Sequence, residues 1–164
     1  IEELLARVTS PALLVALDEI TDPHNFGAIV RSAVALGAQG VITLKQRAAP
    51  VTPTVVRASA GATEHASIAR VTNLSRTLEL LRSQEYEVVG LAGEGDHEVS
   101  QLGPVPVGRV LVVGSEGKGL RRLVRKNCDL LVRIPLAGPV ESLNASVAAG
   151  IALEHAARAM RRAP

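Results

Sequence analysis

Short apolar runs alternate along this chain with longer stretches in which apolar residues recur every three or four positions. The apolar runs predict strands at about residues 12–18, 40–44, 66–71, 86–91, 109–113 and 130–134. The helical spacing predicts helices at about residues 2–8, 26–36, 74–84, 119–126 and 142–162. Because strands that alternate with helices are typical of βαβ units, we expect an α/β fold with a mostly parallel sheet and helices on both faces.

The length and composition fit one domain. A chain of 164 residues, 47% of them apolar, is long enough to bury a sizeable core. The glycine- and proline-containing stretches 92–108 and 135–141 are too short to separate two cores, so we interpret them as loops. We expect residues 11–164 to form the domain and residues 1–10 to be a leading helix or the remnant of an interdomain linker.

Several classes of protein are excluded by the composition. No apolar stretch is long enough for a membrane span, and the first residues lack the order of a signal peptide, so we expect a cytoplasmic protein. The single cysteine, Cys128, rules out an internal disulfide, and we expect it to be a buried, inert thiol. The histidines are scattered without a metal-binding spacing, so we expect no metal.

The basic residues are clustered, although the net charge is only +2. The clusters lie in a loop, on a short helix and near the C-terminus: Lys45 and Arg47; Arg121, Arg122, Arg125 and Lys126; Arg158, Arg161 and Arg162. Such clusters suit a phosphate backbone, and solvated helix faces are the alternative. Phe26 and Tyr86 are the only aromatic residues, so contact with RNA would run through phosphate and ribose rather than through base stacking.

The strand at 109–113 breaks into the segment Gly114-Ser115-Glu116-Gly117-Lys118-Gly119. A phosphate-binding P-loop would need glycine at position 112 and serine or threonine at position 119, but Val112 and Gly119 stand there. The glycines instead indicate a tight backbone path around a ligand. Glu116 would be a fixed carboxylate that could hold an arginine through two hydrogen bonds.

Two further segments carry candidate chemistry at the ends of predicted strands. We expect a turn at 22–25 with Asn25 at its end, and Arg31 lies about a turn and a half into the next helix, near the same crevice mouth. A capped helix with a surface arginine is the alternative. The loop 93–98 resembles a dinucleotide fingerprint, but Glu98 stands at its third glycine position, so it supports NAD or FAD binding only weakly.

The segment 134–146 joins the last strand to the last helix. Pro135 and Pro139 stiffen it, and Ser142, Asn144 and Ser146 place small donors and acceptors near a helix N-terminus, where backbone N–H groups are free. An N-cap with a polar first turn is the simpler interpretation. Because capping alone does not need so rigid a connection, we favour a binding site.

Together, the segments 18–33, 109–119 and 134–146 resemble, in order and spacing, the three motifs of the SpoU (TrmH) family of SPOUT-class RNA ribose 2'-O-methyltransferases. The resemblance spans residues 13 to about 160. Segments 47–56 and 58–65 look most like the branch that methylates a guanosine ribose in 23S ribosomal RNA. Members of that branch usually carry an N-terminal RNA-binding domain, which we expect to be absent here.

The resemblance implies a C-terminal deep trefoil knot, S-adenosylmethionine bound in the knot crevice, and a homodimer in which Asn25 tends to serve the neighbouring subunit's site. It implies catalytic roles for Asn25, Arg31, Glu116, Ser142 and Asn144. The implied cofactor-binding residues are Leu91, Ala92, Gly93, Gly114, Glu116, Gly117, Ile134, Leu136, Ser142, Leu143 and Asn144. We expect RNA to contact Arg31, Lys45, Arg47, Lys118, Arg121 and Arg122.

The expected mechanism relies on positioning rather than on a strong base. A guanidinium with a pKa above about 12 is a poor base, so we expect Arg31 to bind a neighbouring phosphate or to orient the 2'-hydroxyl. Glu116 would hold the guanidinium group of Arg31 in place, and Asn25 and Ser142 would polarise the 2'-hydroxyl. Three alternatives stay open: a transfer-RNA methyltransferase of the same family, a non-catalytic RNA-binding protein on the same fold, and a Rossmann-like oxidoreductase.

Overall fold

Seven parallel strands form one sheet in the structure, which is a computed structural model that describes residues 1–161. The strand order is β3-β2-β1-β6-β4-β7-β5. The strands are β1 (Ala12–Asp18), β2 (Gly40–Leu44), β3 (Ile68–Val71), β4 (Tyr86–Leu91), β5 (His97–Glu98), β6 (Gly108–Gly114) and β7 (Leu130–Arg133). All the pairings between these strands are parallel, which confirms the expected sheet.

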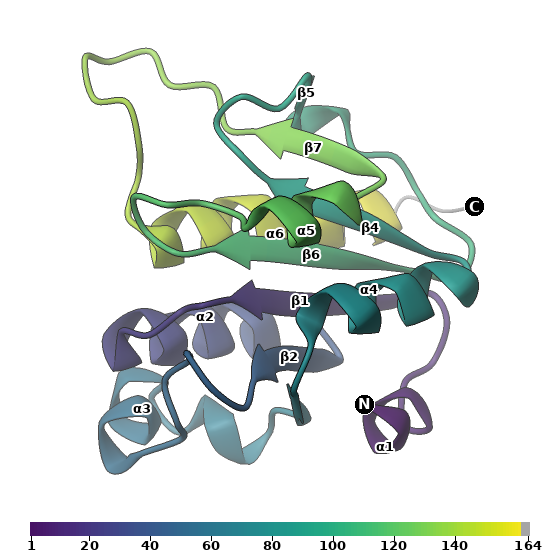
Figure 1. Ribbon diagram of the computed structural model, residues 1–164, viewed down its shortest axis with the longest axis vertical. Coiled ribbons are helices and arrows are strands. Elements are labelled where there is room, and N and C mark those ends of the chain that lie inside the picture. Colours follow the sequence, from purple (N-terminus) through teal and green to yellow (C-terminus); the bar gives the residue numbers. More distant parts are fainter. Residues whose placement is uncertain (162–164) are drawn as a thin grey trace.

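Helices cover both faces of the sheet, as expected. They are α1 (Glu2–Leu5), α2 (Pro23–Ala35), α3 (Pro53–Ala58), α4 (Leu74–Ser83), α5 (Arg122–Lys126) and α6 (Ala145–Arg161), with the 3-10 turns η1 (Ala62–Glu64) and η2 (Val99–Gln101). Figure 1 shows α4 and α5 in front of the sheet and α2, α3 and α6 behind it.

The sheet divides the apolar core into two clusters. Phe26 and Ile29 of α2 and Leu153 of α6 belong to one cluster, and Leu74 and Leu78 of α4 belong to the other. Since β1 lies between β2 and β6 and is covered on both faces, every one of its residues is buried. This explains why its sequence is a continuous apolar run instead of an alternating one.

The element boundaries differ from the expected ones in several places. The segment 22–25, expected to be a turn, is the first turn of α2: the Asp22 side chain accepts a hydrogen bond of 3.0 Å from the His24 backbone N–H, and Pro23 opens the helix. The expected loop 92–108 contains β5 and η2, and α3 and η1 were not predicted. The last helix begins at Ala145 rather than at Ser142, and its expected end at Arg162 lies outside the described residues.

No helix among residues 1–161 is long and apolar enough to cross a membrane, and no cluster of potential ligands in that range could hold a metal ion. Cys128 is only partly buried, but burial raises the pKa of its thiol to about 12. The thiol is therefore protonated at neutral pH and unreactive, as expected.

Candidate functional site

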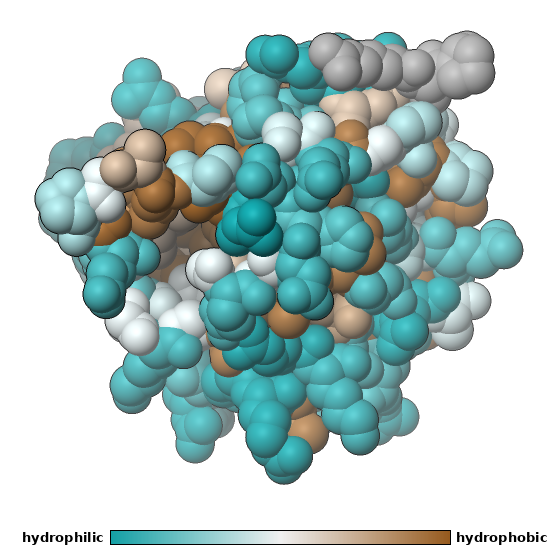
Figure 2. All heavy atoms as spheres, turned by 90° about the horizontal axis from the view of Figure 1, so that it is seen from above, coloured by the Kyte–Doolittle hydropathy of each residue, from teal (hydrophilic) through white to brown (hydrophobic). Residues whose placement is uncertain are grey.

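A cavity of about 500 Å³ lies where β4, β6 and β7 end. It is lined by residues 91–94, 113–120, 141–143, Arg125, Ile134, Leu136, Ala145 and Ala148. In Figure 2, hydrophobic surface gathers around a hollow at the left of the molecule, the side on which β6 and β7 end in Figure 1. Ligands bind at the carboxyl ends of the strands in open parallel sheets, so this cavity is the first candidate for the site.

One wall of the cavity is a tightly folded loop after β6, residues 114–120. The Gly119 N–H donates a hydrogen bond of 2.9 Å to the Ser115 carbonyl, and the two residues form an isolated antiparallel bridge. Gly117 and Gly119 have φ angles of 79° and 64°, a left-handed conformation that favours glycine. The loop thereby returns across Gly114 and leaves backbone groups facing the cavity.

Gly114 has no room for a side chain, and this gives a testable prediction. A Cβ atom at Gly114 would lie 2.3 Å from the Gly119 carbonyl carbon, a backbone atom that cannot move without opening the loop. We expect Gly114→Ala to destabilise the fold by about 1–3 kcal/mol and to weaken ligand binding in the cavity. Gly93 is the matched control because it lines the same cavity and a Cβ there has no neighbour within 4 Å. Equal effects of Gly114→Ala and Gly93→Ala on melting temperature would contradict this interpretation.

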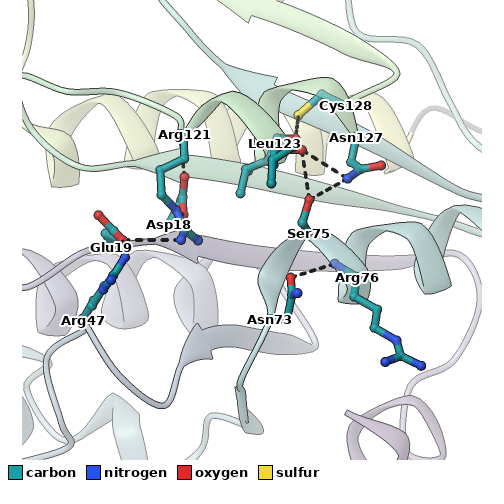
Figure 3. Close-up of polar contacts among 11 residues, drawn as sticks. Asp18, Glu19, Arg47, Asn73, Ser75, Arg76, Arg121, Leu123, Asn127 and Cys128 are labelled. Carbon is teal, nitrogen blue, oxygen red and sulfur yellow. Dashed lines mark hydrogen bonds and ion pairs between the residues drawn. The ribbon is translucent and has the colours of Figure 1, made fainter.

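The end of the glycine loop is fixed by a buried carboxylate. Asp18, the last residue of β1, is fully buried and accepts hydrogen bonds from the backbone N–H (2.8 Å) and the Nε (2.7 Å) of Arg121. Glu19 lies 3.4 Å from Nη1 of Arg121 and 3.5 Å from Nη1 of Arg47. Figure 3 shows these four side chains together. Reasoning from the sequence missed Asp18, although an aspartate that ends an apolar strand is a recognisable signal.

A hydrogen bond joins the first and third expected motifs. Asn144 Nδ2 donates to Asn25 Oδ1 at 3.0 Å, so the start of α2 is tied to the start of α6. Asn144 Oδ1 accepts from the backbone N–H groups of Ser146 (2.9 Å) and Val147 (3.3 Å), which is the role of an N-cap. Asn25 is nearly buried in this arrangement. The capping interpretation is therefore correct, and the contact between Asn25 and Asn144 is one that the sequence analysis did not predict.

Arg31 does not join the cavity of its own chain. Glu116 and Ser142 line the cavity, whereas Arg31 is exposed on α2 and is absent from the lining. Six positions along a helix correspond to a rotation that places Arg31 about 120° around the axis from Asn25. Among the described residues no ion pair joins Arg31 to Glu116, so the expected fixing of the arginine fork does not occur within one chain.

The lining contains nearly all of the residues expected to hold the cofactor. Leu91, Ala92, Gly93, Gly114, Glu116, Gly117, Ile134, Leu136, Ser142 and Leu143 face the cavity, and Asn144 does not. The structure adds Glu94 and Arg125, which form an ion pair between the loop after β4 and α5. Because Glu94 and Arg125 lie far apart in the sequence, the sequence analysis did not predict this pair. The titratable side chains in the lining are those of Glu94, Glu116, Lys118, Arg125 and Glu141.

Most of the side chains expected to contact RNA lie on the surface. Lys45, Arg47, Lys118 and Arg122 are exposed, and they follow β2 or β6 at the same edge of the sheet as the cavity. Arg121 differs, because its guanidinium pairs with Asp18 and Glu19. A phosphate backbone could therefore reach four of these cations without disturbing a buried contact.

Comparison with known proteins points to one family. The profile described as the SpoU rRNA Methylase family matches residues 12–154. An uncharacterized tRNA/rRNA methyltransferase of Mycolicibacterium vanbaalenii is 54% identical over 166 residues, covering 99% of this chain and 52% of that protein. The 23S rRNA (guanosine-2'-O-)-methyltransferase RlmB of Pseudomonas putida is 48% identical over 161 residues, covering 96% of this chain and 63% of that protein.

The solved structures agree with these relatives. The SpoU methyltransferase AviRb from Streptomyces viridochromogenes, crystallised with the cofactor AdoMet, superimposes with a TM-score of 0.86 at 34% identity, over 96% of this chain and 63% of that one. The chain thus spans about half of the length of the first relative and under two thirds of the other two.

Proposed function

Because this chain belongs to the SpoU rRNA Methylase family, we propose that it transfers a methyl group from S-adenosylmethionine to a ribose 2'-hydroxyl of RNA. The observation that carries the proposal is the cavity at the ends of β4, β6 and β7, which is lined by residues from the three segments expected to hold this cofactor. A broken dinucleotide fingerprint at 93–98 argues against the oxidoreductase alternative.

The residues of the cavity fit S-adenosylmethionine. A volume of about 500 Å³ lies within the usual range of small-molecule sites. Leu91, Ile134 and Leu136 offer apolar surface for a purine ring, and the glycine loop offers backbone groups for the polar ends of the molecule. When bound, this cofactor supplies an electrophilic methyl group.

The residues of this chain would act by holding the acceptor in line with that methyl group. Positioning of this kind lowers a barrier by several kcal/mol, about 7–11 in the most favourable cases. We assign Arg31 to the RNA, where it binds a phosphate or orients the 2'-hydroxyl, since a guanidinium does not serve as a base. Ser142, which lines the cavity, would hydrogen-bond the same hydroxyl.

We further propose that the active unit is a homodimer. Arg31 is exposed and lies outside the cavity of its own chain, so one chain does not assemble the complete site. A second copy that packs on α2 and α6 would bring its own Arg31 to Glu116 of the first. Such packing is supported by two small or apolar residues that are exposed on these helices, Ala35 on α2 and Val147 on α6.

We also propose that the chain after β7 is threaded as a deep trefoil knot. The segment between β7 and α6 lines the same cavity as the loops after β4 and β6, and α6 packs against α2 and β6. A threaded path would bring these three separate loops around one ligand. It is also the feature that ordinary connection rules would not suggest.

The substrate that we propose is a guanosine of 23S ribosomal RNA. The test incubates the purified chain with methyl-labelled S-adenosylmethionine and with transcripts of 23S ribosomal RNA and of transfer RNA. We expect label in the 23S transcript, at a 2'-O-methylguanosine identified after digestion. Transfer to the transfer RNA alone would move the substrate to the other branch, and cofactor binding without transfer to either RNA would favour a non-catalytic role.

A further inference from the structure

We propose that Asp18 and Arg121 are positioning residues that hold the glycine loop in its cofactor-binding shape. This proposal rests on the proposed function, because it assigns these residues to the same cavity. It also gives Arg121 a different role from the neighbouring basic side chains, which we expect to contact RNA. The inference comes from a pair that lies 103 positions apart in the sequence and meets in the structure at 2.7 Å.

The geometry places the pair at the point where the loop leaves the cavity wall. Asp18 is paired in the sheet with Gly114, where the loop begins, and its carboxylate binds Arg121, which directly follows the last lining residue of the loop, Leu120. The Asp18 carboxylate at the end of β1 thus holds the end of the glycine loop close to its beginning. The bridge between Ser115 and Gly119 closes the loop between these two points.

The charge of Asp18 makes this contact strong. A fully buried carboxylate is costly unless it is paired and hydrogen-bonded, and Arg121 provides both a backbone N–H and a guanidinium N–H. In Figure 3 the Arg121 side chain extends toward Asp18 and Glu19. Glycine-rich segments lose much conformational entropy when they are ordered, so a loop with three glycines depends on such an anchor to keep one shape.

The two carboxylates around Arg121 are not equivalent, and this difference supplies a control. Asp18 makes the short, buried contacts, whereas Glu19 lies 3.4 Å from Arg121 and its side chain is 21% exposed. Because the Glu19 contact is longer and open to water, it contributes less to stability and to shape than the Asp18 contact. Only the loss of the Asp18 contact should therefore change the loop.

The test measures the affinity of each purified variant for S-adenosylmethionine by calorimetry, well below its melting temperature. We expect Asp18→Asn and Arg121→Gln each to weaken binding by about 10–100-fold, since small displacements of a binding element have effects of this size. Arg121→Lys keeps a cation and the backbone N–H, so it should recover part of the affinity. Glu19→Gln should stay within about twofold of the original chain.

A second measurement separates positioning from RNA contact. Arg122→Ala should weaken RNA binding and reduce its salt dependence by about one counterion, without changing cofactor affinity. Arg121→Gln should show the opposite pattern. Equal salt dependence of the Arg121→Gln variant and the original chain supports positioning, and a reduced dependence with unchanged cofactor affinity overturns it.

The outcomes distinguish this inference from the proposed function. If the original chain does not bind S-adenosylmethionine, the proposed function fails. If it binds and the folded Asp18 and Arg121 variants bind equally well, with only their melting temperatures lowered, the pair is merely structural and this inference is overturned. If Asp18→Asn does not fold, the comparison of Arg121→Gln with Arg121→Lys decides in the same way.

Discussion

Replacing Arg31 with alanine should reduce methyl transfer by at least about 10²–10³-fold while leaving the affinity for S-adenosylmethionine within a few fold of the original value. The physical reason is the separation of the two sites in one chain: Arg31 is exposed on α2, and the cavity is lined by other elements. An interaction made with the RNA at the transition state affects the rate and not the binding of the methyl donor.

The measurement for Arg31→Ala pairs single-turnover methyl transfer with cofactor calorimetry. Arg57, an exposed arginine on α3 outside the cavity lining, gives the control variant Arg57→Ala, which should transfer methyl groups at nearly the original rate. Equal losses of cofactor affinity and rate in Arg31→Ala would reject the division of labour proposed here.

Mixing two impaired variants tests whether Arg31 acts at the cavity of its own chain or at that of the partner chain. In a mixed dimer, the Arg31→Ala subunit keeps an intact cavity and the Gly114→Ala subunit keeps Arg31. The two parts would together form one complete site. If subunits exchange freely, half of the dimers are mixed and each has one complete site, so the mixture should regain about a quarter of the original activity. No recovery in a mixture shown to contain mixed dimers would mean that Arg31 serves its own chain.

The hydrophobic pattern was sufficient to predict the sheet, because each strand between two helical layers must be apolar on both sides. Residues 12–17 of β1 and 110–113 of β6 are continuous apolar runs for this reason, and both strands were predicted within a residue or two. The two-residue strand β5 and the short helix α3 were missed, since neither is long enough to show a period. Asp22 and Pro23 did carry the signal of a helix start, and the turn predicted there was wrong because that signal was assigned to a loop.

The candidate site was predictable where it depends on strand ends and unpredictable where it depends on side chains meeting across the fold. Gly114 and Ile134 lie at the ends of strands that the apolar pattern predicts, and the family resemblance implied their role and that of Ser142. The pairs Asp18 with Arg121 and Asn25 with Asn144 join residues 103 and 119 positions apart, and no local spacing reports such contacts. The expected contact of Glu116 with Arg31 is not made within one chain, and it stays a prediction for the dimer.

Replacing Glu87 with alanine should lower the free energy of unfolding by about 3–5 kcal/mol, a large share of the roughly 5–15 kcal/mol that stabilises a typical domain. Arg109 lies in the central strand β6 and is only 1% exposed. Its Nε donates to Glu87 Oε2 at 2.6 Å and its Nη2 to the Gly103 carbonyl at 2.8 Å, while its Nη1 has no partner among the described residues. Without Glu87, a buried guanidinium would lose its counter-charge.

Two further variants show whether the unpaired charge, rather than lost packing, causes this instability. Adding Arg109→Met to Glu87→Ala removes the stranded cation and fills most of its volume, so the double variant should be more stable than Glu87→Ala alone. Glu154→Ala removes the exposed partner of Arg158 on α6 and should cost no more than about 0.5 kcal/mol. Urea denaturation of the four proteins measures these differences. A Glu87→Ala variant as stable as Glu154→Ala would mean that water reaches Arg109 and that the pair contributes little to the sheet.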